Sequence, residues 1–137
     1  TEDEFEEMCD FVREMEFERL GVFQYSHEEN TSAFDLEDDV PAAEKTRRQR
    51  RIMAAQKKIV AARQQARVGS RARMVVDGPS PEHEWVFTGR LPGQAPDIDP
   101  LVYLTEADPA TLSPGQFLEV EIVGAKGYDL IARPLDL

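Results

Sequence analysis

The sequence predicts an α+β protein in which two helical segments precede a small five-stranded antiparallel β-barrel. The first observation is a change of hydrophobic period at Arg71, from helical spacing before this residue to alternation after it. The second is the density of turn signals beyond Arg71, which divide fewer than 70 residues into five short apolar runs. The third is a charge distribution in three blocks, which indicates three structural units.

The first unit is expected to begin with an amphipathic helix over 2-EDEFEEMCDFVREMEF-17. Acids crowd its first turn, where the helix dipole favours them. The apolar run at residues 20–23 follows almost at once and predicts a short buried strand. The apolar residues of the helix recur at helical spacing and are expected to fill core: Phe5, Met8, Cys9, Val12 and Met15.

A second helix is predicted within residues 38–69. Asp39 is a plausible N-cap, Pro41 suits a first turn, and Gly69 suits a C-terminal stop. Two interpretations of its basic face stay open: a nucleic-acid surface, or a solvated face that partly neutralises the acidic block before it. The apolar stripe comprises Ile52, Gln56, Ile59, Val60 and Ala66, and the basic residues are Arg47, Arg48, Arg50, Arg51, Lys57 and Lys58.

The charge blocks restrict the partners. Residues 1–44 carry 16 acids and 2 bases, residues 45–70 carry 9 bases and no acid, and residues 71–137 carry 11 acids and 5 bases. This partition argues against one uniform nucleic-acid surface. No apolar run approaches the roughly 20 residues that span a bilayer, and the first residues lack the features of a signal peptide, so we expect a cytoplasmic protein without membrane contact.

The remaining residues predict the barrel. The expected strands are 71–78, 84–91, 100–106, 117–124 and 128–135, and in the fourth the apolar residues Leu118, Val120 and Ile122 alternate with Glu119 and Glu121. A barrel of this size closes its own edges, and such barrels are more often binding modules than catalysts. Cys9 is the only cysteine, so no disulfide and no cysteine cluster for a metal can form within the chain.

Three segments together carry a family resemblance: 20-LGVFQYSHEENTSAF-34, a Pro-started helix with 47-RRQRRIMAAQKKI-59, and 89-GRLPGQAPDIDPLVYL-104. Their order resembles the C-terminal part of the radical S-adenosylmethionine methylthiotransferases and covers the whole chain. The resemblance implies that residues 1–40 are the terminal α/β piece of a radical SAM barrel, residues 41–69 a closing or linker helix, and residues 70–137 a TRAM domain with an OB-like barrel. Asn30 replaces the usual glycine, and asparagine tolerates left-handed backbone angles.

Two branches of the family differ at the motif after residue 24. Transfer-RNA methylthiotransferases resemble YSPRPGT, whereas ribosomal-protein aspartate methylthiotransferases of the RimO type resemble YSPEEGT. This chain reads YSHEENT, with Glu28 and Glu29 at the variable positions. Two carboxylates repel a polyanion and attract a basic protein, so the expected partner is the basic twelfth small-subunit ribosomal protein rather than RNA.

The resemblance also implies an activity for the parent enzyme. It would hold two [4Fe–4S] clusters on upstream cysteines, cleave S-adenosylmethionine and add a methylthio group to the β-carbon of an aspartate. This chain would hold no cofactor, would be inactive alone, and would recognise the substrate. The expected substrate-binding residues are Glu28 and Glu29, on a barrel-rim loop with Tyr25, Ser26 and Thr31. They also include Asp97 and Asp99, in the 95-APDID-99 loop, and Arg90 beside that loop.

Two other functions stay open. One is the RNA-binding TRAM part of a tRNA adenosine methylthiotransferase, which would need aromatic platforms interleaved with bases on the barrel surface. The other is a purely structural fragment without binding of its own. The candidate platforms are Trp85, Phe87, Tyr103 and Tyr128, whose alternating positions fit core packing better.

Overall fold

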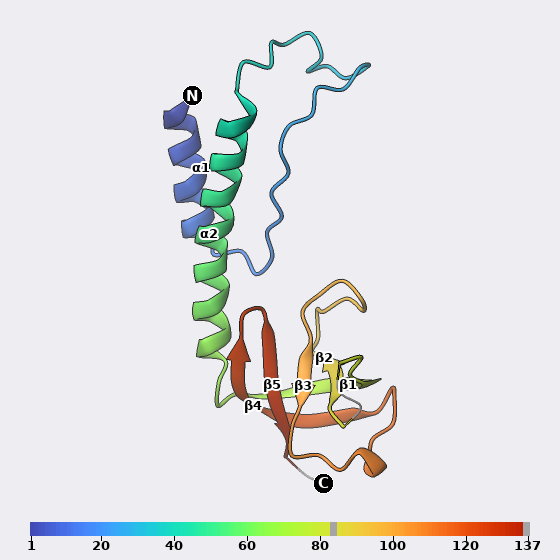
Figure 1. Ribbon diagram of the computed structural model, residues 1–137. Helices are drawn as coiled ribbons and strands as arrows, with labels where there is room; N and C mark the ends of the chain where they lie inside the picture. The colour runs from blue at the N-terminus through green and yellow to red at the C-terminus, as the bar shows by residue number, and fades with distance from the viewer. Residues whose placement is uncertain (83–84, 136–137) are drawn as a thin grey trace. The chain divides into compact units, whose positions relative to one another are not determined.

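The computed structural model describes residues 1–82 and 85–135, and the chain divides into two compact units, Thr1–Val60 and Ala61–Leu137 (Figure 1). The helices are α1 (Glu2–Met15) and α2 (Ala42–Ala66), and the second of these runs from one unit into the other. The strands are β1 (Arg71–Pro79), β2 (Phe87–Arg90), β3 (Val102–Leu104), β4 (Phe117–Lys126) and β5 (Asp129–Pro134), with a short 3-10 turn at Pro109–Thr111. The predicted α+β class, with two helices and a five-stranded closed barrel, is confirmed.

Helix α1 begins with a capping box, in which the Thr1 hydroxyl accepts a hydrogen bond from the Glu4 amide at 3.3 Å. It ends at Glu16, whose left-handed backbone (φ 46°) closes the last turn. Three of the predicted apolar residues are buried, namely Phe5, Cys9 and Val12. Met8 and Met15 are each 52% exposed, so the buried stripe is narrower than the sequence pattern predicted.

The core of the first unit lies between α1 and the N-terminal part of α2, which run side by side (Figure 1). Ile52 joins the buried residues of α1, and Leu20, Val22 and Ile59 pack against this cluster. Gln56 is fully buried and donates from Nε2 to the carbonyl of Phe17 at 2.6 Å. Of the stripe predicted for α2, Ile52, Gln56 and Val60 are buried and Ile59 is half-buried, whereas Ala66 is exposed.

Part of the basic face of α2 forms ion pairs inside the first unit. Arg47 bonds Glu2 and Glu44 at 2.7 Å each, Arg48 bonds Glu44 at 2.7 Å, and Arg51 pairs with Glu6. The interpretation that this face neutralises the acidic block is therefore confirmed for these three arginines. The remaining cations predicted on the face, Arg50, Lys57 and Lys58, are exposed.

These ion pairs predict a loss of helix contacts in acid. Hydrogen bonds from Arg47 and Arg48 lower the pKa of Glu44 to about 2, and a hydrogen bond from Arg51 lowers the pKa of Glu6. A lowered folded-state pKa contributes stability that is complete above the unfolded pKa near 4.5 and is lost as the pH falls toward about 2. We expect chemical shifts of the α1 amides to change over this window, and to change less in Glu6→Gln, which removes the α1 carboxylate that Arg51 binds. An α1 spectrum that is constant from pH 6 to pH 2 would contradict this.

The predicted strand at residues 20–23 is wrong. Residues 17–40 contain no helix or strand. Polar side chains of α2 form hydrogen bonds with this segment instead. Gln49 donates from Nε2 to the Val22 carbonyl at 2.7 Å, and Gln24 donates to Thr46 Oγ1 at 3.1 Å. A strand needs a neighbour for its backbone hydrogen bonds, and the described residues of the first unit offer no second strand.

The second unit is a closed barrel with strand order β1-β2-β3-β5-β4. Four of its pairings are antiparallel, but β3 and β5 are parallel, with Val102 opposite Leu130. The prediction of an entirely antiparallel barrel was wrong at this pair because β3 and β5 meet only through closure of the barrel. Its core includes Met74, Val76, Val102, Leu104, Leu118, Val120, Ile122, Leu130 and Ala132, so the alternation predicted for the fourth strand is confirmed.

The second strand is shorter than predicted. It begins at Phe87, so Trp85 lies in a turn with 76% of its surface exposed and does not fill core, while Glu84 lies outside the described residues. Phe87 is 8% exposed, which agrees with core packing. Tyr103 and Tyr128 are half-buried.

We expect hydrogen–deuterium exchange to separate the two units. Amides of the barrel strands lie in ladders around a buried core, whereas residues 17–40 lack regular backbone hydrogen bonds. Exchange by local opening should therefore be faster in this segment by orders of magnitude. Equal protection of the barrel and of residues 17–40 would show that the segment is ordered by contacts absent from this structure.

Candidate functional site

The barrel-rim residues predicted from sequence lie together in the loop that follows residue 24. The Tyr25 hydroxyl donates to the Ala33 carbonyl at 3.3 Å, and the ammonium of Lys45 lies 5.3 Å from the centroid of its ring. The Thr31 hydroxyl donates to the Glu28 carbonyl at 2.8 Å. Asn30 has φ 64°, the left-handed conformation that asparagine tolerates, so the turn expected at this position is present.

Glu28 and Glu29 are both exposed on this loop. The Glu28 carboxylate accepts a hydrogen bond from the Ser26 hydroxyl at 2.8 Å, a neutral donor that leaves its charge in place. Neither carboxylate forms an ion pair with any residue that the structure describes. The loop therefore offers two uncompensated negative charges to a partner.

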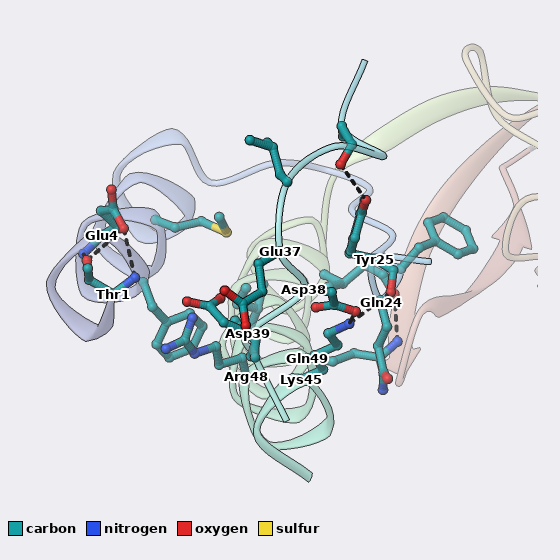
Figure 2. Close-up of a pocket in the computed structure, with 18 residues that line it drawn as sticks. Thr1, Glu4, Gln24, Tyr25, Glu37, Asp38, Asp39, Lys45, Arg48 and Gln49 are labelled. Carbon is teal, nitrogen blue, oxygen red and sulfur yellow. Dashed lines mark hydrogen bonds and ion pairs between the residues drawn. The ribbon is translucent and has the colours of Figure 1, made fainter. Parts of the chain in front are cut away.

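A pocket of about 520 Å³ lies beside this loop, within the Thr1–Val60 unit (Figure 2). Three successive carboxylates line it, and one of them, Asp38, is paired with Lys45. Glu37 and Asp39 form no ion pair within the described part of the chain, and both are exposed. The apolar part of the lining comprises Phe5, Met8, Val22, Phe23, Ala33, Leu36, Val40 and Ile52.

Sequence reasoning missed this pocket and its acids. The signal that could have found them is 35-DLEDD-39, an acidic run with one leucine directly before Pro41. The sequence instead predicted Asp39 as the N-cap of α2. The Pro41 carbonyl accepts hydrogen bonds from the amides of Glu44 and Lys45 at 2.9 and 3.0 Å, so Pro41 occupies the cap position. The leucine and the three acids after it line the same pocket. Hydrophobic periodicity could not predict this, because a loop has no regular period.

The other predicted site residues lie in the barrel. Arg90 binds Asp77 on β1, with its Nε 2.9 Å from both carboxylate oxygens. The Asp99 carboxylate accepts a hydrogen bond from the Ala95 amide at 2.6 Å and so stabilises the conformation of the loop. Asp97 is exposed, with φ 60°, and makes no hydrogen bond or ion pair among residues 1–82 and 85–135.

This difference between the two aspartates predicts unequal effects on stability. Asp99→Ala leaves the Ala95 amide without its acceptor and should lower the free energy of unfolding by about 1 kcal/mol. Asp97→Asn keeps the left-handed backbone accessible and removes no internal contact, so it should be close to neutral. Urea denaturation of both variants checks this. Equal losses would show that Asp97 also supports the fold.

The described residues contain no group of three or more His, Cys, Asp and Glu side chains that could hold a metal ion. Cys9 is 1% exposed in the core of the first unit, and one cysteine does not fit the ligand set of a [4Fe–4S] cluster. Within the part that the structure describes, no helix is both long enough and apolar enough to cross a bilayer.

The barrel surface mixes charges of both signs. Arg71 lies opposite Glu121 and Arg73 opposite Glu119, and Arg133 bonds Glu121 at 2.8 Å. One feature favours a nucleic-acid ligand: the Arg73 guanidinium lies 4.7 Å from the ring centroid of Phe117, which is 61% exposed. The neighbouring carboxylates oppose the phosphate contacts that such a ligand needs.

Comparisons with known proteins agree with the barrel and extend over both units. Residues 68–135 match the TRAM domain family. The chain is 46% identical over 136 residues to "Ribosomal protein uS12 methylthiotransferase RimO" of Myxococcus xanthus, and 46% identical to the protein of the same name from Sorangium cellulosum. The corresponding protein of Porphyromonas gingivalis is 40% identical over 137 residues. Each match covers 99% of this chain but only 28%, 27% and 31% of the relative.

Proposed function

We propose that this chain is the substrate-recognition part of an enzyme that modifies the basic ribosomal protein uS12, because its barrel matches the TRAM domain family and the whole chain is similar to RimO-type methylthiotransferases. The chain spans less than a third of the length of these relatives, so the chemistry would reside elsewhere in the parent protein. A ribosomal substrate also implies a cytoplasmic location.

The proposed activity is the addition of a methylthio group to the β-carbon of an aspartate in uS12. Two [4Fe–4S] clusters and S-adenosylmethionine would supply the radical chemistry in the parent enzyme. The residues of this chain would bind and orient the substrate, and the chain alone would be inactive. The aspartate chemistry and the cofactors rest on the family resemblance of the sequence motifs.

The observation that carries the recognition role is the pair of uncompensated carboxylates at Glu28 and Glu29. Three arginines of the basic helix are already engaged, because Arg47, Arg48 and Arg51 are paired with Glu2, Glu6 and Glu44. A basic protein gains attraction at such a loop, whereas a phosphate backbone is repelled. Glu37 and Asp39, beside the same loop, add two further negative charges.

The first unit has the surface of an incomplete domain. Phe23 is 92% exposed, Leu36 is 68% exposed, and Phe11 is 52% exposed. Apolar surface of this extent is typically covered by another polypeptide. We infer that residues 1–40 complete a radical SAM barrel with polypeptide outside this chain, and that residues 41–69 connect this barrel to the TRAM domain at residues 70–137.

A salt titration tests the recognition role. The chain should bind purified uS12 at 0.1 M salt, measured by isothermal titration calorimetry. The affinity should fall as added salt shortens the screening length from about 10 Å toward about 3 Å at 1 M. An affinity that does not change with salt would contradict recognition through the acidic loops, and no binding at 0.1 M salt would contradict the role itself.

A second candidate function is RNA binding by the TRAM domain, as in the tRNA branch of the family. The contact of Arg73 with the exposed ring of Phe117 is the feature that favours it, because a base could stack on such a platform. If it applied, Phe117→Ala would weaken RNA binding and leave uS12 binding unchanged.

A further inference from the structure

The loop between β2 and β3 is restrained both by its prolines and by side-chain hydrogen bonds. Residues 91–100 read LPGQAPDIDP, with prolines at 92, 96 and 100 that fix three φ angles. Gly93 (φ 84°) and Asp97 (φ 60°) supply the two left-handed turns. The conformational entropy of this loop is therefore already low before any partner binds.

Side-chain hydrogen bonds close the base of the loop. Gln94 accepts from the Leu91 amide through Oε1 at 2.6 Å and donates from Nε2 to the Pro100 carbonyl at 2.8 Å. The carboxylate of Asp99 holds the Ala95 amide at 2.6 Å. Arg90 lies at the base of the loop, where Asp77 binds its guanidinium. Arg90 and Asp99, both predicted from sequence to contact substrate, thus support the loop from inside.

The residues left to face a partner form a mostly apolar tip. Ile98 is 83% exposed, and Pro92 and Pro96 are exposed beside it in sequence. Asp97 is the only charged residue among residues 92–98, and it makes no ion pair within the described residues. A rigid loop that holds an isoleucine in water loses little entropy on binding and gains the burial of that side chain.

We propose that residues 92–98 are a preformed docking surface for a basic polypeptide, with Ile98 as the apolar anchor and Asp97 as the charged contact. This inference rests on the proposed function, because the polypeptide it commits to is the basic ribosomal protein. A nucleic acid fits the tip poorly: the tip carries no lysine or arginine, and Arg90, the nearest arginine in sequence, is bound to Asp77.

The test compares single variants of the whole chain for binding to purified uS12. Ile98→Ser should weaken binding by about tenfold, which is the order expected when one apolar side chain no longer becomes buried. Asp97→Asn, which removes the charge and keeps a residue type that tolerates the left-handed backbone, should weaken it as well, and this loss should shrink at high salt. The matched control is Trp85→Ser, which removes an apolar side chain of similar exposure, 76%, from a different turn of the same barrel.

All three side chains are exposed, so thermal unfolding should not distinguish the variants from the wild type. Binding that is lost in Ile98→Ser and kept in Trp85→Ser supports the docking surface. If both Ile98→Ser and Asp97→Asn bind uS12 with wild-type affinity, this inference is overturned and the proposed function is left intact. A wild type that does not bind uS12 at all contradicts both.

Discussion

Gly89→Ala is expected to lower the free energy of unfolding of the barrel by about 3 kcal/mol, because the barrel has no room for a methyl group at this position. A Cβ on Gly89 would lie 2.2 Å from the Val75 carbonyl oxygen and 2.3 Å from the terminal methyl of Met74. The carbonyl belongs to the backbone of β1, which pairs with β2 at this level, so the clash cannot be relieved by one rotamer change. Urea denaturation followed by circular dichroism measures the loss.

Gly124→Ala is the matched control in β4. A Cβ there would lie 3.4 Å from Cδ1 of Ile131, an ordinary contact, and Gly124 has no left-handed backbone. Its stability should stay within about 1 kcal/mol of the wild type. Equal stability of the two variants would show that β1 and β2 are not packed as closely as described.

Reversing the charge of the loop that carries Glu28 and Glu29 is expected to have the largest effect on binding. In Glu28→Lys with Glu29→Lys, two exposed negative charges become positive, and the affinity for uS12 at low salt should fall by about tenfold or more. The Ser26 hydroxyl loses its contact with the Glu28 carboxylate, but this exposed hydrogen bond contributes little to the fold. The affinity should partly recover as salt screens the repulsion.

The control for this double variant makes the same change of net charge elsewhere in the unit. Glu7 and Glu14 are exposed on α1 and form no ion pair among the described residues, so Glu7→Lys with Glu14→Lys alters the overall charge equally. A comparable loss in both double variants would attribute binding to net charge alone. A loss of uS12 affinity in the Glu28 and Glu29 double variant alone would indicate that this loop contacts uS12.

The barrel could be predicted from the sequence because its signal is local. Leu118, Val120 and Ile122 alternate with glutamates, and that alternation fixes which side of the strand is buried whatever its neighbours are. The parallel pairing of β3 with β5 could not be predicted, because it depends on how the ends of the sheet meet. For residues 20–23 the composition indicates a strand, but a strand forms only beside a partner.

The candidate site was harder to predict for a different reason. Asp97 and Asp99 are identical side chains two residues apart, and only the folded loop shows that Asp99 binds a backbone amide while Asp97 faces solvent. Arg90 likewise pairs with Asp77, which lies 13 residues earlier on a neighbouring strand. Glu28 and Glu29 were selected from the motif that bounds their loop, and their contact with a substrate stays a prediction.

The choice between protein and RNA tests the account most directly. The whole chain should be titrated in parallel with uS12 and with transfer RNA, in the same buffer at 0.1 M salt. We predict that uS12 binds more tightly, that Glu28→Lys with Glu29→Lys reduces this binding, and that transfer RNA binds weakly. Tight binding of transfer RNA together with no affinity for uS12 would contradict recognition of a basic protein and would favour the RNA branch of the family.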